Sequence, residues 1–329
     1  MQLPQFEYVE SKSLEDAARF LQEKGRQSML IGGGTDMLPS MKQRVYHPTY
    51  IISLAAVPDL KQIQFDDNGG LKLGSGLKLC TLENNAKIKK RFPIVAQAAG
   101  AVGSPQLREM GTLGGNLCLD TRCYYYNQSE TWRKCRTACI KMGGDVCNAI
   151  GSGKKCFAVF SGDMAPALIA LNATIVLHSA RGERTIPLDE LYSGDGARPL
   201  AKQPDEILMR VEIPGQQKGT LGTYSKYRIR RSIDYPLAGV ATMLAMDSND
   251  KVCRGVKVVI GAVGTCPAAV NGITELLINQ KLDDSLIEEA SDLAYKAAKP
   301  IANTAGTPFH RKVMIKAYVK RALEHASGT

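Results

Sequence analysis

The stretch Leu30-Ile31-Gly32-Gly33-Gly34-Thr35-Asp36-Met37 runs from an apolar segment into three consecutive glycines. Consecutive glycines let several backbone N–H groups turn toward one anion, as a pyrophosphate requires. The stretch is not a Rossmann fingerprint, because G-x-G-x-x-G needs a glycine where Met37 stands. It is not a Walker A loop, because no Gly-Lys-Ser/Thr follows. A tight turn between two elements would explain the same glycines.

The residues around this loop predict a small α/β unit. Residues 11–25 predict a helix with apolar side chains on one face and Gly25 at its end. Residues 28–31 and 50–54 predict short apolar strands. Strand and helix alternate here, which is typical of an α/β arrangement.

A second glycine-rich stretch, Gly111-Thr112-Leu113-Gly114-Gly115-Asn116, has the same character, and we expect it to be a loop. Two such loops on one chain favour one large ligand with a diphosphate over two unrelated turns.

The rest of the chain mixes strands and helices without a repeat. The predicted strands are residues 71–73, 77–79, 206–213, 222–230, 240–246 and 252–260. Residues 94–102 predict a helix, and residues 165–177 predict a helix that leads into a strand. Near the C-terminus, residues 283–297 and 309–325 predict two further helices.

The nine cysteines are unevenly distributed, and six of them lie between positions 118 and 156. From Cys123 the spacing reads C-x11-C-x3-C-x7-C-x8-C. An odd number of cysteines without a secretory signal argues against a secreted disulfide framework. Zinc ribbons use two close pairs, whereas only Cys135 and Cys139 are close here. Spacing alone leaves zinc, an iron–sulfur cluster and simple buried thiols open; we favour iron–sulfur because the segment has no histidine.

Length and composition describe an ordinary folded protein. The 329 residues allow two or three compact units of ~100–200 residues each. No apolar run reaches the ~18 residues of a membrane span. The start, MQLPQFEYVE, has no basic or apolar signal region, so we expect a cytoplasmic protein. The net charge of +10 is scattered and predicts a solvated basic face rather than a nucleic-acid site.

In combination, these motifs resemble the FAD-binding medium subunit of the xanthine dehydrogenase/carbon monoxide dehydrogenase family. Residues 30–37 resemble its first flavin loop, and residues 111–116 resemble its second. Further resemblances, in the family's order, are Gly76 to Leu82, Ser161-Gly162-Asp163-Met164-Ala165-Pro166-Ala167-Leu168, Glu206-Ile207-Leu208, and Lys226 with Arg230, Asp234 and Ala238. The resemblance covers nearly the whole chain.

The resemblance implies an α+β fold with a two-part FAD-binding domain, residues 1–56 and 57–218, and a C-terminal α+β domain, residues 219–329. FAD would lie between the two parts, with the glycine loops on its pyrophosphate. Val102, Asp163, Leu208 and Lys226 would lie near the ribityl chain or ring, although Lys226 could instead be a surface lysine. The implied FAD-binding residues are Leu30, Ile31, Gly32, Gly33, Gly34, Thr35, Asp36, Met37, Gly76, Thr81, Val102, Gly111, Thr112, Leu113, Gly114, Gly115, Asn116, Asp163, Leu208 and Lys226.

One departure from the family pattern is the cysteine-rich insertion, about residues 118–158, between Asn116 and Asp163. It resembles the β subunit of 4-hydroxybenzoyl-CoA reductase, in which the insertion carries a 4Fe–4S cluster. That resemblance implies four metal ligands: Cys123, Cys139, Cys147 and Cys156. Cys135 and the other cysteines would be free or buried thiols.

The function implied is electron transfer in a molybdenum enzyme that converts 4-hydroxybenzoyl-CoA to benzoyl-CoA. Electrons would pass from ferredoxin through the 4Fe–4S cluster to FAD. They would continue to a small 2Fe–2S subunit and a large molybdenum subunit, in a dimer of heterotrimers. This chain would contribute no catalytic residue. Two alternatives remain: an ordinary molybdenum hydroxylase flavin subunit that passes electrons outward, and a zinc-stapled interaction protein on a flavin fold.

Overall fold

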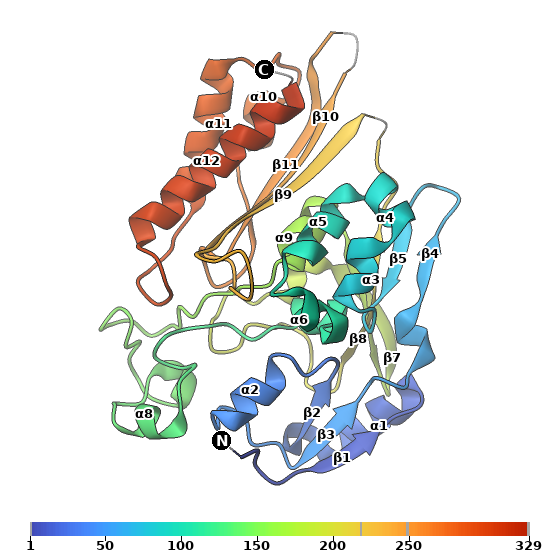
Figure 1. Cartoon of the computed structure of the whole chain (residues 1–329), viewed down its shortest axis with the longest axis vertical. Coiled ribbons are helices and arrows are strands. Elements are labelled where there is room, and N and C mark those ends of the chain that lie inside the picture. The colour runs from blue at the N-terminus through green and yellow to red at the C-terminus, as the bar shows by residue number, and fades with distance from the viewer. Residues whose placement is uncertain (1, 218, 248–249, 328–329) are drawn as a thin grey trace.

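The computed structural model describes residues 2–217, 219–247 and 250–327. Within these residues the chain forms three sheets, each accompanied by its own helices (Figure 1). Residue 218, where the sequence predicts the end of the second part of the FAD-binding domain, lies outside the described residues. The mixture of helices and strands agrees with the predicted α+β class.

The N-terminal unit is a parallel sheet of order β1-β3-β2 with two helices. Its elements are β1 (Glu7–Glu10), α1 (Leu14–Lys24), β2 (Ser28–Ile31), α2 (Met37–Lys42) and β3 (Tyr50–Ser53). Ser13 caps α1 by accepting a hydrogen bond from the Asp16 N–H at 3.1 Å, and Gly25 ends the helix. The predicted helix and both predicted strands are confirmed. Strand β1 escaped prediction because its residues are mostly exposed and include no apolar run.

The second unit is an antiparallel sheet of order β4-β5-β8-β6-β7 with helices packed against it. Its strands are β4 (Ile63–Phe65), β5 (Leu71–Gly74), β6 (Thr174–Ser179), β7 (Gly182–Pro187) and β8 (Ile207–Ile213). Its helices are α3 (Leu79–Asn84), α4 (Ala86–Arg91), α5 (Pro93–Ala101), α6 (Pro105–Met110), α7 (Leu113–Leu117) and α9 (Met164–Ala170). Helix α8 (Glu130–Lys134) lies in the cysteine-rich insertion between α7 and α9.

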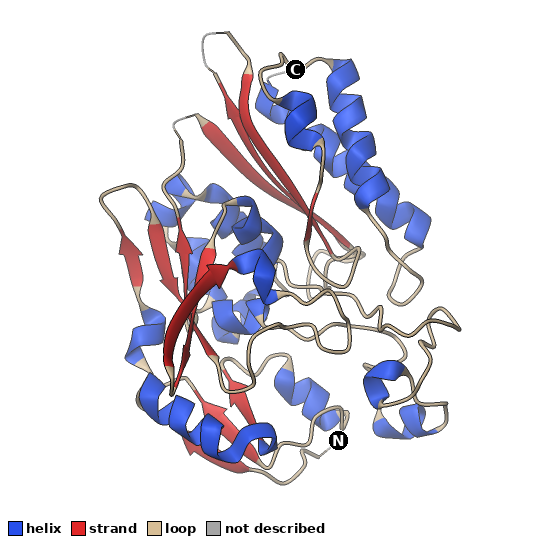
Figure 2. Cartoon of the chain, turned by 180° about the vertical axis from the view of Figure 1, so that it is seen from behind, coloured by secondary structure: helices blue, strands red, loops and turns tan. Residues whose placement is uncertain are grey.

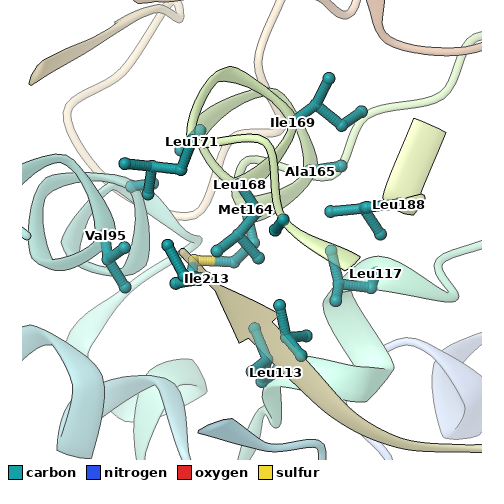
Figure 3. Packing of buried hydrophobic residues seen from close by; sticks show 14 of the residues in the cluster. Val95, Leu113, Leu117, Met164, Ala165, Leu168, Ile169, Leu171, Leu188 and Ile213 are labelled. Atoms are coloured by element: carbon teal, nitrogen blue, oxygen red, sulfur yellow. The ribbon is translucent and has the colours of Figure 1, made fainter. Parts of the chain in front are cut away.

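Helix α9 lies at the centre of this unit's core, and every one of its residues is buried (Figure 3). Met164 and Leu168 are completely inaccessible to solvent. Burial of one such side chain stabilises a fold by ~1.5–3 kcal/mol. The helix therefore fixes the backbone just before it, which carries Asp163.

The predicted strand at residues 77–79 is wrong. Helix α3 begins at Leu79, and the backbone just before it hydrogen-bonds to the second glycine stretch instead of joining a sheet. The Leu79 N–H donates to the Gly111 carbonyl, and the Leu113 N–H donates to the Leu77 carbonyl, both at 2.9 Å. The apolar side chains that suggested a strand are buried in the core under this loop.

The second glycine stretch is only partly a loop. Thr112 caps the short helix α7, which begins at Leu113. The expected loop of residues 111–116 therefore turns into a helix after its second residue.

The C-terminal unit is an antiparallel sheet of order β12-β11-β10-β9 covered by helices. Its elements are β9 (Thr220–Tyr227), β10 (Ala238–Met246), β11 (Cys253–Gly261), β12 (Ala268–Ala269), α10 (Ile273–Leu277), α11 (Asp284–Ala297) and α12 (Pro308–Ser327). Figure 1 shows α11 and α12 along one face of this sheet. Strand β10 is buried on both faces: Val240 and Leu244 belong to the core with α11 and α12, whereas Ala241 and Met243 belong to the core of the second unit.

The cysteine-rich insertion leaves the second unit and projects beside α2, with α8 at its far end (Figure 1). Seen from behind, it consists mainly of loops (Figure 2). Its irregular structure agrees with the lack of periodicity in its sequence. None of the helices in the described part of the chain combines the length and the hydropathy that crossing a bilayer needs.

Candidate functional site

A cavity of about 810 Å³ opens where all three units meet. Its size lies within the range of roughly 300–1,000 Å³ that is typical of cofactor sites. Most of the sequence-predicted flavin residues line it: Leu30, Ile31, Gly32, Gly33, Gly34, Thr35, Asp36, Met37, Val102, Gly111, Thr112, Gly115, Asn116 and Asp163. The structure therefore brings together the two glycine stretches, which lie about 80 positions apart in the sequence.

The other predicted flavin residues do not line the cavity. Leu113 and Leu208 are buried in the hydrophobic core, and Thr81 lies in α3. A Cβ atom on Gly76 would lie 2.9 Å from the Leu60 side chain, and one on Gly114 would lie 2.8 Å from the Ser75 side chain. These glycines therefore permit close packing of the support beneath the cavity. Lys226, the last residue of this group, belongs to a buried network with Asp163.

The first glycine loop needs glycine because it touches the segment before the second one. A Cβ atom on Gly33 would lie 1.8 Å from the Met110 carbonyl oxygen, a distance that no side chain can adopt. Gly34 has a φ of +70°, in the left-handed region that glycine prefers. The two loops therefore form one continuous wall in which backbone groups face the cavity.

The second glycine loop is held rigidly by its own polar side chains. The Thr112 hydroxyl accepts a hydrogen bond from the Gly115 N–H at 3.1 Å. The Asn116 side-chain oxygen accepts one from the Met164 N–H at 3.0 Å, at the start of the buried helix α9. Asn116 therefore connects the loop to the core and to the neighbouring Asp163.

Asp163 lines the cavity from within a buried network. Its carboxylate accepts hydrogen bonds from the Tyr224 hydroxyl at 2.8 Å and from the Lys226 Nζ at 3.0 Å. Lys226 also donates to the Ala101 carbonyl at 2.8 Å. The side chains of Lys226 and Asp163 are 4% and 3% exposed. Burial raises the pKa of Asp163, and the charge of Lys226 acts in the opposite direction.

This network places Lys226 behind Asp163. The sequence predicts Lys226 beside the flavin or on the surface, yet it neither lines the cavity nor lies in solvent. It acts on the cavity through the carboxylate that it holds.

Three units are joined at the cavity by Asp36, Arg122 and Tyr235. Asp36 Oδ1 accepts hydrogen bonds from Arg122 Nη1 at 2.6 Å and from the Tyr235 hydroxyl at 2.9 Å. The Arg122 guanidinium lies 4.3 Å from the centre of the Tyr235 ring. Burial, with the charge of Asp36, raises the pKa of Tyr235. The contact links the first glycine loop, the insertion and the C-terminal unit around one space.

The four predicted metal ligands line a second, smaller pocket: Cys123, Cys139, Cys147 and Cys156. The last three are buried, whereas Cys135 is exposed and lies outside the pocket. Burial raises the pKa of the Cys123 thiol to about 11, and the other three thiols add to that rise. The four cysteines are neighbours in space because they line one small pocket.

Tight turns position three of these cysteines. The carbonyl of Cys123 accepts hydrogen bonds from the N–H groups of Tyr126 and Asn127 at 3.0 and 2.9 Å. Cys139 begins a similar turn toward Met142, as does Cys147 toward Ile150 and Gly151. Such turns direct side chains inward without a regular helix or strand. They explain why a segment without periodicity still forms a defined group of thiols.

The four thiols do not form a site for a single ion. Across residues 2–217, 219–247 and 250–327, no group of three His, Cys, Asp or Glu side chains could hold one metal ion. A tetrahedral zinc site would hold its sulfurs ~2.3 Å from one centre. In a 4Fe–4S cluster each thiolate binds a different iron, so the sulfurs stand farther apart. Cysteine thiolates are donors that both arrangements use.

Sequence reasoning missed several residues that line these cavities, among them Tyr46, Asp120, Arg122, Tyr126, Lys141 and Tyr235. Four of them stand within three positions of a predicted cysteine ligand, which is a signal that the sequence does contain: Asp120, Arg122, Tyr126 and Lys141. Tyr46 and Tyr235 reach the cavity only through the fold and carry no local signal.

Comparison with protein families covers nearly all of the chain. Residues 4–216 match the family described as "FAD binding domain in molybdopterin dehydrogenase". Residues 223–326 match the "CO dehydrogenase flavoprotein C-terminal domain".

Two curated relatives match over nearly their whole length. The alpha subunit of the 6-hydroxypseudooxynicotine dehydrogenase complex of Paenarthrobacter nicotinovorans is 26% identical, over 99% of this chain and 96% of the relative. The carbon monoxide dehydrogenase medium chain of Hydrogenophaga pseudoflava is 25% identical, over 98% and 97%.

Solved structures share the fold. A structure of carbon monoxide dehydrogenase from Hydrogenophaga pseudoflava superimposes with a TM-score of 0.81 at 23% identity, covering 99% of this chain and 98% of that one. Quinoline 2-oxidoreductase from Pseudomonas putida 86 gives 0.79 at 22% identity, covering 100% and 99%. With the family matches, these findings confirm the predicted flavin fold. The chain therefore belongs to the FAD-binding medium subunits of the xanthine and carbon monoxide dehydrogenase family of molybdenum enzymes.

Proposed function

We propose that this chain is the FAD and 4Fe–4S subunit of a molybdenum enzyme that removes the phenolic hydroxyl of 4-hydroxybenzoyl-CoA. The observation that carries the proposal is the second pocket, where the four cysteines of the insertion converge beside the flavin cavity. A flavin subunit that passes electrons only between FAD and its partners has no need for these thiols. Four thiolates are the usual protein ligands of one 4Fe–4S cluster.

The residues of the large cavity suit FAD. The two glycine loops present backbone groups to the pyrophosphate, and Asp163 with Val102 lies on the side proposed for the ribityl chain or ring. When bound, FAD supplies exchange between one- and two-electron transfer. This chain contributes the binding, the orientation and the surrounding charges.

The residues of the small pocket suit a cluster by number and donor type. The pocket itself measures about 10 Å³, so the turns around it would have to open to admit one. Those turns lie in a segment of loops and short helices. When bound, the cluster supplies one-electron transfer, and it requires a compartment that keeps thiols reduced, for which we propose the cytoplasm.

The proposed partners follow from the family. We place molybdenum and substrate on a large subunit and the 2Fe–2S clusters on a small subunit, in a dimer of heterotrimers. Relatives of this chain are named as medium chains or subunits of complexes. Ferredoxins are acidic one-electron carriers, and a net charge of +10 on this chain is compatible with such a donor. We also keep the domain boundaries at residues 56/57 and 218/219 as proposals.

The second candidate function is that of an ordinary hydroxylase flavin subunit. The relatives named above favour it, because they belong to dehydrogenases. In that case electrons would leave the molybdenum centre through FAD to an acceptor, and the four thiols would carry no metal.

Two cysteine variants of the assembled complex test the cluster assignment. Cys139→Ser should lose the cluster iron and its EPR signal while FAD stays bound, because Cys139 lines the pocket. Cys135→Ser is the matched control on the same insertion and should keep about four irons per chain. Equal iron in the two variants would contradict the assignment.

Product analysis tests the reaction. The complex, supplied with a chemically reduced one-electron donor, should take up two electrons and two protons per 4-hydroxybenzoyl-CoA and release benzoyl-CoA and water. A complex that carries its cofactors and oxidises a dehydrogenase substrate, but never forms benzoyl-CoA, would favour the ordinary hydroxylase.

A further inference from the structure

The flavin cavity and the cysteine pocket share one wall. Tyr126 and Lys141 line both spaces. Each belongs to a turn that begins at a predicted cluster ligand: the Tyr126 N–H donates to the Cys123 carbonyl, and Lys141 stands two positions after Cys139. The wall is therefore built from the same turns that place the thiols.

Lys141 is held firmly inside this wall. Its side chain is 4% exposed, and its Nζ donates to Asp120 Oδ1 and to the Thr121 hydroxyl, both at 2.6 Å. The ammonium also lies 4.8 Å from the centre of the Tyr126 ring. A buried ammonium with three such partners has one position, so its charge acts at a fixed place.

The negative charge that pairs with Lys141 lies on the side of the flavin cavity. Asp120 lines the flavin cavity but not the cysteine pocket, and the Tyr46 hydroxyl and the Thr121 N–H also donate to it, at 2.8 and 2.9 Å. Lys141 therefore lines the cysteine pocket, whereas its carboxylate partner does not.

We infer that Tyr126 and Lys141 form the electron-transfer contact between the two cofactors, and that the Lys141 ammonium raises the reduction potential of the cluster. The inference rests on the proposed function, since it requires a cluster in the cysteine pocket. Reduction adds one negative charge to the cluster, and a nearby fixed positive charge stabilises that reduced form. Each electron that leaves the reduced cluster is accepted by FAD, and the external one-electron donor replaces it.

Redox titration of the assembled complex, followed by EPR of the cluster, tests this role. Lys141→Met should lower the equilibrium constant for cluster reduction at least tenfold, which is 59 mV for one electron. Lys134→Met is the matched control: it removes a lysine of the same insertion that is 74% exposed and lines neither space. It should leave the potential unchanged.

A second variant gives the opposite sign. Asp120→Asn removes the carboxylate that offsets Lys141, so the cluster potential should rise. This variant still tests the effect of the Lys141 charge if the Lys141→Met complex fails to assemble. If Lys141 and Asp120 only supported the structure, their two variants would not shift the cluster potential in opposite directions.

The outcomes separate the two proposals. An iron-containing complex with the same cluster potential in wild type, Lys141→Met and Asp120→Asn would overturn the inference and leave the proposed function standing. A wild-type complex without iron would overturn the proposed function, and the inference with it. Opposite shifts in the two variants, with an unchanged Lys134→Met, would support the role of Lys141.

Discussion

At the scale of single residues, the buried pair of Asp163 and Lys226 shows how charge is kept at the flavin cavity. Taking two ions out of water costs several kcal/mol each, and only good geometry offsets that cost. Here the carboxylate has two donors, Tyr224 and Lys226, and the ammonium has a second acceptor in Ala101. Lys226 thereby keeps a carboxylate in place on the cavity wall.

Replacing Lys226 should therefore be costly. Lys226→Met leaves Asp163 buried without its ammonium partner and with the Tyr224 hydroxyl as the one side-chain donor left within the described residues, and we expect a loss of about 3–5 kcal/mol in the free energy of unfolding. Urea unfolding monitored by circular dichroism measures this loss.

The double variant Asp163→Asn with Lys226→Met is the control, because it removes both charges. It should recover a large part of the lost stability. A double variant as unstable as the single one would contradict the account of an uncompensated charge.

Single residues also show what sequence reasoning can and cannot reach. The resemblance to a family pattern, and not the cysteine spacing, selected the four thiols that line one pocket in the structure. Lys141 and Tyr126 could not be singled out, because a lysine or tyrosine in a loop is usually solvated. Only the fold shows that Lys141 is buried and lines both cavities.

At the scale of elements, the first glycine loop is defined by its contact with the segment before α7. The strands and helices on either side were predictable from their apolar periodicity. The error at residues 77–79 has a clear cause: two leucines with strand-like spacing are also what a short buried connection before a helix requires. Their backbone partners lie in the second glycine stretch, which local sequence cannot indicate.

This contact predicts the effect of a single methyl group. Gly33→Ala would place a carbon 1.8 Å from the Met110 carbonyl oxygen, so the two loops must separate. We expect FAD content to fall at least tenfold, measured by absorbance of the purified protein.

Gly255→Ala is the matched control in β11. Its added carbon would lie 3.6 Å from the Ala245 side chain, an ordinary contact, and FAD content should not change. Full FAD content in Gly33→Ala would show that the loop contact is not needed for binding.

The contact between helices α11 and α12, near the C-terminus, predicts that the stability of the fold depends on pH. The Glu288 carboxylate lies 2.7 Å from Lys316 and 2.9 Å from Lys320, and these lysines hold its pKa at about 2, below the usual 4.5. A lowered carboxyl pKa stabilises the folded state above the unfolded value and loses that effect as the pH falls.

The melting temperature of wild type should therefore fall more steeply between about pH 4.5 and 2 than that of Glu288→Gln. Glu289→Gln, at the next exposed position, should follow wild type. Parallel curves for wild type and Glu288→Gln would refute a role for this network.

At the scale of the whole molecule, the cavity is built from all three units. Matching the chain to a family gave the order of the units, and each unit's elements were largely predictable. The contact between Asp36, Arg122 and Tyr235 could not be predicted from the sequence. The three residues are far apart in sequence, and each is ordinary in its own segment. Long-range packing alone brings them together.

Tyr235 should therefore influence how long FAD stays bound. Tyr235→Phe removes only the hydroxyl that donates to Asp36, a hydrogen bond of about 0.5–1.5 kcal/mol, so FAD should dissociate about two- to tenfold faster. Dilution of the holoprotein, followed by flavin fluorescence, measures this rate. Tyr8→Phe, at an exposed tyrosine of β1, is the control, and equal rates in the two variants would contradict the bridging role.

The most direct test of the central claim is the iron, zinc and flavin content of the anaerobically purified wild-type complex, with an EPR spectrum after dithionite reduction. We predict one FAD and about four irons for each copy of this chain, beyond the iron of the partner's 2Fe–2S clusters, with the signal of a reduced 4Fe–4S cluster. FAD accompanied by zinc, or by no metal on this chain, would contradict the claim and return it to the ordinary hydroxylase flavin subunits.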